Sequence, residues 1–154
     1  MKMDNENPRS TAKIMGHPIH PMLVPFPIGF LVGALFSDLA YWQTSDPFWA
    51  NASFYLLGAA LVFAALAALA GLTDFFGDKR VRDLSAAWRH MIGNVTAVVL
   101  SLVNFLMRLG DAEDAILPNG LAISAIVGLI LLYTGWQGGE LVYRHRVGIP
   151  NERV

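Results

Sequence analysis

The chain has 154 residues, of which 55% are hydrophobic and only 15% are charged, a composition too apolar for an ordinary soluble domain. Eleven basic and twelve acidic residues give a net charge of -1, which excludes the strongly basic surface that nucleic-acid binding needs. The absence of cysteine excludes disulfides, iron–sulfur clusters, cysteine-bound zinc and haem attached through thioethers.

Residues 1–21 form a polar N-terminal arm that contains the segment HPIHP and lacks the features of a cleavable signal peptide. Four segments then have the roughly 20 apolar residues that a membrane-spanning helix needs. We place these spans at 22–42, 50–73, 89–109 and 119–143, followed by a short tail at 144–154. We find no internal repeat. The sequence therefore predicts an all-α protein, a membrane-embedded antiparallel four-helix bundle over residues 22–143.

Basic residues predict the orientation of this bundle, because Lys and Arg in short loops stay on the cytoplasmic side. They precede span one, connect spans two and three, and follow span four, whereas Arg108 alone lies on the opposite side. We therefore expect a multi-pass protein of the inner membrane with both termini in the cytoplasm. Span two is rich in Ala and Gly, which favours close packing of helices within the bilayer.

The segment from Gly16 to Pro27 contains four prolines and two histidines. Proline lacks a backbone N–H and clashes with the preceding helical turn, so we expect HPIHP to be extended and Pro25 or Pro27 to begin the first helix. Such an entry segment would hold His17 and His20 rigidly at one end of the bundle. Alternatively, each is an interfacial histidine that bonds headgroups or loop carbonyls.

Span three carries a mostly polar helical face whose residues follow at intervals of four and three: His90, Asn94, Ala97, Ser101, Asn104 and Arg108. Polar side chains lose their hydrogen-bond partners in hydrocarbon, so this face is expected to line the bundle axis. Asp38 lies at a similar depth on span one, and we predict a structural polar clamp between Asp38, Asn104 and Arg108.

The predicted topology gathers His17, His20, His90, His145, Asp74 and Glu140 at the cytoplasmic end. We predict that His20 and His90 bind a cofactor, with His17 beside them. Spans one and three run in the same direction, so their inner ends share a level. Asp74, Asn94, Glu140 and His145 would orient an imidazole or carry a proton.

The runs GHPIHPMLVPFPIG at 16–29 and GWQGGELVYRHRVGI at 135–149, together with His90 and Asn94, resemble the bacterial membrane-protein family known as domain of unknown function 2231. The likeness extends from Gly16 to Ile149, although Arg146 stands where a small residue is expected. The resemblance implies a four-span membrane domain of unestablished activity. Some relatives are joined to Rieske-type domains, which points to electron transfer and to redox proteins as partners.

Three functions fit these observations. A b-type haem, or a metal ion held by histidine, would sit near the cytoplasmic face and support electron transfer, since haem can be held noncovalently by one or two histidines. A non-catalytic module that packs against partner proteins is the alternative, and an ion or proton carrier built on the span-three face is the third. No common soluble-enzyme motif is present, and we assign no catalytic residue. The lipid bilayer is an expected partner, and the sequence does not decide whether the protein also forms a homo-oligomer.

Overall fold

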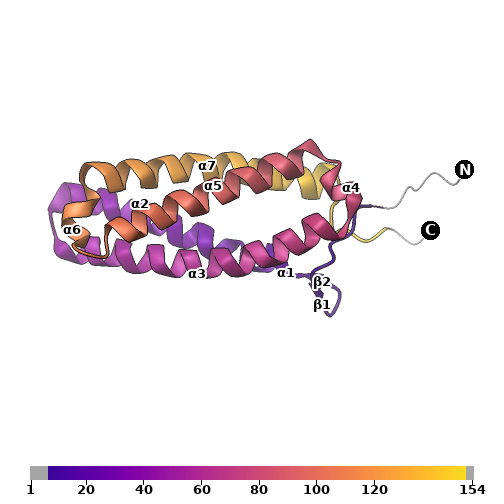
Figure 1. Cartoon of the computed structure of the whole chain (residues 1–154), viewed down its shortest axis with the longest axis horizontal. Helices are drawn as coiled ribbons and strands as arrows, with labels where there is room; N and C mark the ends of the chain where they lie inside the picture. The colour runs from indigo at the N-terminus through magenta and orange to yellow at the C-terminus, as the bar shows by residue number, and fades with distance from the viewer. Residues whose placement is uncertain (1–6, 152–154) are drawn as a thin grey trace, which may run out of the picture.

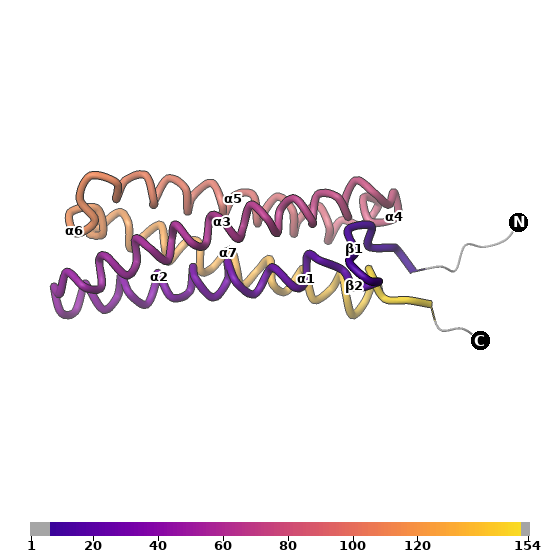
Figure 2. Tube along the Cα trace, turned by 90° about the horizontal axis from the view of Figure 1, so that it is seen from below, coloured from indigo at the N-terminus to yellow at the C-terminus, as the bar shows by residue number. Residues whose placement is uncertain are grey.

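The computed structural model describes residues 7–151 and is almost entirely helical. Four long antiparallel helical segments lie side by side, joined by short links (Figures 1 and 2). The elements in chain order are β1 (Lys13–Ile14), β2 (His17–Pro18), α1 (Ile19–Leu23), α2 (Pro25–Thr44), α3 (Pro47–Gly77), α4 (Lys79–Arg82), α5 (Ser85–Met107), α6 (Ala112–Ala115), the wide turn η1 (Ile116–Gly120), α7 (Leu121–Gly139) and the wide turn η2 (Glu140–Arg144).

These helices confirm the predicted four-span membrane bundle. Four segments are long and apolar enough to cross a bilayer: Ile19–Thr44, Pro47–Gly77, Ser85–Met107 and Ala112–Arg144. The first, second and fourth extend beyond the predicted spans at both ends, whereas the third begins and ends earlier than predicted. Pro47 can occupy the first turn of α3, and polar end turns continue the helices past their apolar stretches. Large apolar side chains cover the outside, including Leu69, Leu129 and Leu132, as lipid-facing surfaces require.

The entry to the first helix differs in part from the expectation. His17 and Pro18 are extended in β2, but His20 and Pro21 are already in the short helix α1. Pro21 occupies the first turn of α1, where its missing N–H breaks no helical hydrogen bond. Pro25 begins α2, as predicted. The expectation of a fully extended HPIHP is therefore wrong, because each proline falls where a helix tolerates it.

Two helical hairpins make up the bundle, one from α2 and α3 and the other from α5 and α7. Each hairpin also packs on the other, through α2 with α7 and α3 with α5. The core is built largely from small side chains such as Ala34, Ala60 and Ala97, with Leu31 and Val127 beside them. Small side chains let the helix backbones approach closely, which stabilises helix packing in lipid.

The two hairpins bury the same positions, although their residue types differ. The buried α2 residues 27, 31, 34 and 38 correspond to the buried residues 97, 101, 104 and 108 at the α5 end. Buried α3 residues 53, 57, 60, 67 and 70 likewise correspond to 120, 124, 127, 134 and 137. This is the pattern of a two-fold axis along the bundle. The correspondence lies in burial rather than in residue identity, so it is not visible as a repeat in the sequence.

The ends of the described chain meet at one end of the bundle, which we call the terminal end. The backbone N–H of Asn7 donates to the side chain of Asn151, and the N–H of Gly148 donates to the Pro8 carbonyl. The opposite end, which carries the α2–α3 link and η1, is called the loop end (Figure 1).

Candidate functional site

Two histidines from different hairpins face each other across the terminal half of the bundle. His20 lies on α1 and His90 lies in the first turns of α5. Their ring centroids are 6.1 Å apart, and the ring planes are nearly perpendicular, at 87°. Both residues are half-buried. The pairing that the sequence predicts between these two side chains is therefore present in the geometry.

Each imidazole is held by a backbone carbonyl of its own hairpin. The Nδ1 atom of His20 lies 2.8 Å from the Ala67 carbonyl oxygen, and Nδ1 of His90 lies 2.9 Å from that of Thr134. A carbonyl oxygen only accepts hydrogen bonds, so Nδ1 must carry the proton in both rings. In a neutral imidazole the lone pair is then on Nε2, which is the arrangement of a histidine ready to bind a metal.

A glycine one helical turn after each carbonyl makes room for the ring. A Cβ atom at Gly71 would lie 2.9 Å from both Cε1 and Nδ1 of His20, and one at Gly138 would lie 3.2 Å from Cε1 of His90. Gly71 follows Ala67, and Gly138 follows Thr134, by four residues in each case. The two histidines thus occupy equivalent cradles in the two hairpins.

Asn94 connects α5 to α7 beside this pair. Its side-chain N–H donates to the His90 carbonyl at 2.7 Å, and its carbonyl oxygen accepts from the Thr134 hydroxyl at 3.3 Å. Thr134 therefore holds His90 through its backbone and Asn94 through its side chain. Asn94 contacts the backbone of His90 and not its ring.

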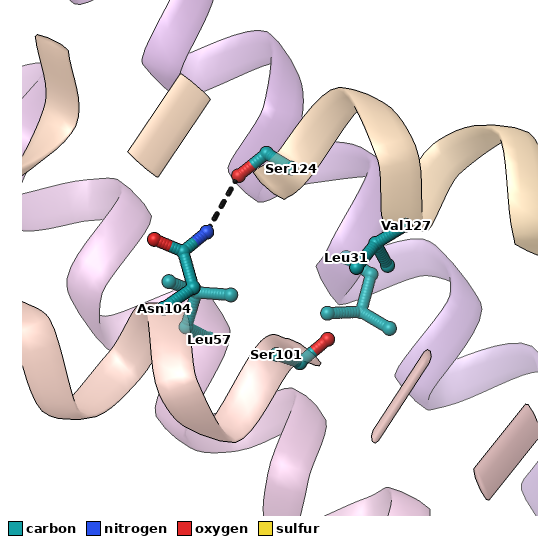
Figure 3. A pocket seen from close by; sticks show the side chains of 6 residues that line it. All are labelled: Leu31, Leu57, Ser101, Asn104, Ser124 and Val127. Atoms are coloured by element: carbon teal, nitrogen blue, oxygen red, sulfur yellow. Dashed lines mark hydrogen bonds between the residues drawn. The ribbon is translucent and has the colours of Figure 1, made fainter. Parts of the chain in front are cut away.

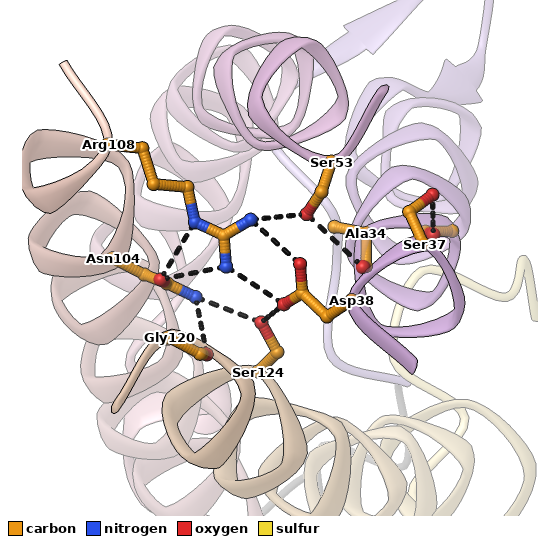
Figure 4. A network of polar contacts seen from close by, with 9 residues as sticks. Ala34, Ser37, Asp38, Ser53, Asn104, Arg108, Gly120 and Ser124 are labelled. Carbon is orange, nitrogen blue, oxygen red and sulfur yellow. Dashed lines mark hydrogen bonds and ion pairs between the residues drawn. The ribbon is translucent and has the colours of Figure 1, made fainter. Parts of the chain in front are cut away.

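At the loop end, Asp38 and Arg108 form a buried ion pair (Figure 4). Both side chains are fully buried, and two parallel bonds of 2.8 Å join the guanidinium to the two carboxylate oxygens. Asn104 accepts two further bonds from Arg108. The contact predicted between Asp38 and Arg108 is thus present, and Asn104 belongs to the same network.

The model of one membrane-protein family, described as "Predicted membrane protein (DUF2231)", matches residues 16–151. The chain belongs to the DUF2231 family. No curated protein and no solved structure matches it. The family match covers both histidines and the whole ion-pair network, and its description names a predicted membrane protein without assigning an activity.

Two serines of this DUF2231 protein complete the ion-pair network, and neither belongs to the polar contacts predicted from the sequence. Ser53 accepts a bond of 2.6 Å from Arg108 and donates to the Ala34 carbonyl. Ser124 donates to Asp38 at 2.6 Å and accepts from Asn104 at 2.9 Å. Each serine interrupts an apolar span, which is the signal that could have identified it. Among residues 7–151, no buried side-chain nitrogen or oxygen lacks a hydrogen-bond partner.

The remaining predicted site residues of the DUF2231 chain have other partners at the terminal end. His17 is exposed, with its Nδ1 3.1 Å from the Met15 carbonyl. Asp74 accepts bonds from the backbone N–H groups of Thr11 and Ala12, both at 2.7 Å, and so holds the N-terminal arm.

Glu140 pairs with Arg144 at 3.2 Å, and the backbone N–H of His145 donates to the Glu140 carbonyl. In the part of the chain that the structure describes, no three His, Asp or Glu side chains are grouped so that they could hold a metal. The structure therefore joins His20 to His90, and it does not gather all six predicted groups into one cluster.

Outside the charged network, the interior of the DUF2231 bundle has little space. A narrow pocket lies between the four helices, lined by Leu31, Leu57, Ser101, Asn104, Ser124 and Val127, and it has no room for even a water molecule (Figure 3). Binding sites for drug-sized ligands have volumes of about 300 to 1,000 Å³. This pocket is too small for such a ligand, and Asn104 and Ser124 in its lining already bond to each other.

Proposed function

We propose that His20 and His90 bind a b-type haem as its two axial ligands and that the protein carries electrons near the cytoplasmic face of the membrane. The observation that carries this proposal is the pair of imidazoles, each fixed at Nδ1 by a carbonyl so that Nε2 is free. Noncovalent haem suits a chain without cysteine.

The separation of the two rings supports binding to one metal centre. A metal–imidazole bond is about 2 Å long, and the ring centre lies about 1 Å beyond the nitrogen, so two imidazoles on opposite sides of one metal have centroids about 6 Å apart. The observed separation is 6.1 Å. Perpendicular ring planes are compatible with this arrangement, because each imidazole can rotate about its own metal–nitrogen bond without changing the distance to the metal.

The number of protein ligands favours haem over a bare metal ion. Two imidazoles leave at least half of the positions of a zinc or iron ion unfilled, and no third histidine or carboxylate joins them among residues 7–151. A porphyrin supplies four nitrogen ligands and needs only axial ones from the protein.

A porphyrin bound between the rings would extend towards α3 and α7. On α3 the buried side chains at this level are small, namely Ala64, Ala67 and Ala70. Binding would move the side chains around the rings apart and leave the two imidazoles at about their present separation of 6.1 Å. The protein would supply the axial nitrogens, hold the rings and keep lipid around the haem, and the haem would supply the one-electron chemistry.

The distribution of charge supports an orientation in which both termini are cytoplasmic. Exposed basic residues, among them Lys79, Arg89 and Arg144, lie at the terminal end, whereas Arg108 at the loop end is buried and paired. This is the asymmetry that places short basic loops in the cytoplasm of an inner-membrane protein. Reporter fusions at each terminus test it, and a reporter active only outside the cytoplasm would overturn it.

Absorption spectroscopy of the purified protein titrated with haemin tests the proposed site. We expect six-coordinate low-spin haem in the natural protein, five-coordinate haem in His20→Ala and in His90→Ala, and no specific haem in the double variant. His17→Ala and His145→Ala serve as matched controls and should behave as the natural protein. Equal haem binding by the double variant would overturn the proposal, and so would metal analysis that finds a stoichiometric bare ion instead.

A second candidate is the non-catalytic membrane module, which the closed and fully hydrogen-bonded interior supports. However, many of the small residues that a partner helix would need are already buried inside the bundle, including Ala60, Ala64 and Ala67. The double variant that lacks both His20 and His90 distinguishes the two proposed functions. A module that only packs against partners keeps its cellular role without His20 and His90.

A further inference from the structure

The β1–β2 hairpin presents apolar side chains at the side of the terminal end. Lys13 pairs with Pro18 and Ile14 with His17, so that Met15 and Gly16 form the turn. Both turn residues have positive φ angles, 49° and 83°, as a tight two-residue hairpin turn requires. Ile14 is 61% exposed and Met15 is 94% exposed.

The hairpin is firmly attached, so its exposed tip has a defined position. On one side, Asp74 of α3 accepts bonds from Ser10, Thr11 and Ala12. On the other side, the N–H of Ile19 donates to the Ala12 carbonyl at 2.9 Å, which closes the base of the hairpin next to α1. Figure 1 shows the hairpin projecting sideways from the bundle and not along its axis.

The depth of the hairpin follows from the length of the first span. The roughly 20 residues that cross the hydrocarbon core, counted back from the exposed Trp42 at the loop end, reach about Met22. The hairpin lies just beyond Met22, within the roughly 5 to 8 Å of headgroup region on each side of the core. Met22 and Phe76, which are 63% and 64% exposed, continue the apolar surface at this end.

We propose that the Ile14–Met15 tip inserts among the lipid headgroups and upper acyl chains of the leaflet at the terminal end. The apolar tip is then covered by lipid, and the exposed Lys13 beside it lies at the level of the phosphates. Lipid is the occupant that fits, because the tip projects in the plane of the membrane and lies in the headgroup layer next to the exposed Met22. The hairpin thereby anchors the segment that leads directly to His20.

Spin labelling tests this proposal cleanly, because the chain contains no cysteine that would compete for the label. Met15→Cys is labelled in the full-length protein and reconstituted into phospholipid vesicles. The accessibility of the label to oxygen, which concentrates in lipid, is compared with its accessibility to a water-soluble nickel chelate. Leu69→Cys, at an outward-facing position of α3, is the lipid control, and Asp83→Cys, in the α4–α5 link, is the water control.

We expect the oxygen-to-nickel ratio at residue 15 to be at least about three-fold higher than at residue 83 and lower than at residue 69. A ratio equal to that of residue 83 would place the tip in water and overturn the proposal. Low accessibility to both reagents would show that protein covers the tip, which overturns it equally. Neither result depends on haem, so the inference stands or falls apart from the proposed function.

Discussion

The two hairpins of the bundle contact each other through polar side chains at two levels. The two contacts differ in whether any of their hydrogen-bonding atoms is left without a partner. At the loop end, Asp38 and Arg108 are fully buried, and every polar atom of their network has a partner. At the terminal end, His20 and His90 face each other with only Nδ1 of each ring engaged. A complete network holds a structure together, whereas paired rings with free nitrogens can accept a ligand. The difference locates the candidate site at the terminal end.

Removing Asp38 should have the largest effect on stability. Asp38→Ala leaves the Arg108 guanidinium buried without its counter-charge, which costs about 3 to 5 kcal/mol. Unfolding in mixed detergent, followed by circular dichroism, measures this loss. Asp38→Ala combined with Arg108→Met removes both charges and should recover most of it. A loss below about 1 kcal/mol in the single variant would show that water reaches the ion pair.

Crowding the histidine cradles should have the next largest effect. Gly71→Ala places a Cβ atom 2.9 Å from the ring of His20, and Gly138→Ala places one 3.2 Å from that of His90. We expect the first variant to lose about 1 to 3 kcal/mol and the second to lose less. Gly135→Ala is the control, since a Cβ atom there meets nothing within 4 Å. Equal stability of all three proteins would contradict the close approach of the rings to α3 and α7.

Removing the histidines themselves should change stability little. His20→Ala or His90→Ala loses one hydrogen bond to a carbonyl, worth about 1 kcal/mol. The same unfolding assay applies, with His17→Ala as the control for an exposed ring. Loss of haem binding with the fold retained would then set the terminal end apart from the loop end. A loss as large as that of Asp38→Ala would instead assign the histidines a structural role.

The smallest effect is expected at Asp78, which lies outside the spans between α3 and α4. The hydrogen bond from the Arg80 side chain holds the pKa of the Asp78 carboxyl well below its usual range. A lowered pKa contributes stability above the unfolded-state pKa of about 3.9, and this contribution is lost as the pH falls towards the lower folded-state pKa. Between pH 5 and 8 it should therefore be constant. Unfolding measured from pH 2 to 8 should show a steeper acid loss in the natural protein than in Asp78→Asn, by less than about 1 kcal/mol.

The sequence predicted the fold well because the lipid bilayer constrains it strongly. Span length, apolar composition and the polar face of span three were enough to predict four antiparallel helices and the Asp38–Arg108 contact. Much of the surrounding detail was not predictable in this way. Ser53 and Ser124 stand out as single polar residues in apolar spans, but their partners lie on other helices, so the sequence marks the two residues without revealing what they bind.

The candidate site was predicted in part, for a related reason. His20 and His90 were predicted to pair because their helices run in the same direction, and this contact is present. Asp74, Glu140 and His145 were grouped with them by depth alone. The depth of a residue in the membrane does not specify the direction in which its side chain points around the helix axis. In the structure, the Asp74 side chain binds the N-terminal arm. The roles assigned to Asn94, Glu140 and His145 stay predictions.

The matched burial of the two hairpins also bears on the origin of the site. Histidine occupies the same position in both, and so do the carbonyl and the glycine that receive it. A gene for a single two-helix unit, paired with its own copy, would already have brought two such imidazoles together. Once two such units stand in one chain, their matched positions can differ, and Asp38 and Arg108 are a matched pair that carries opposite charges.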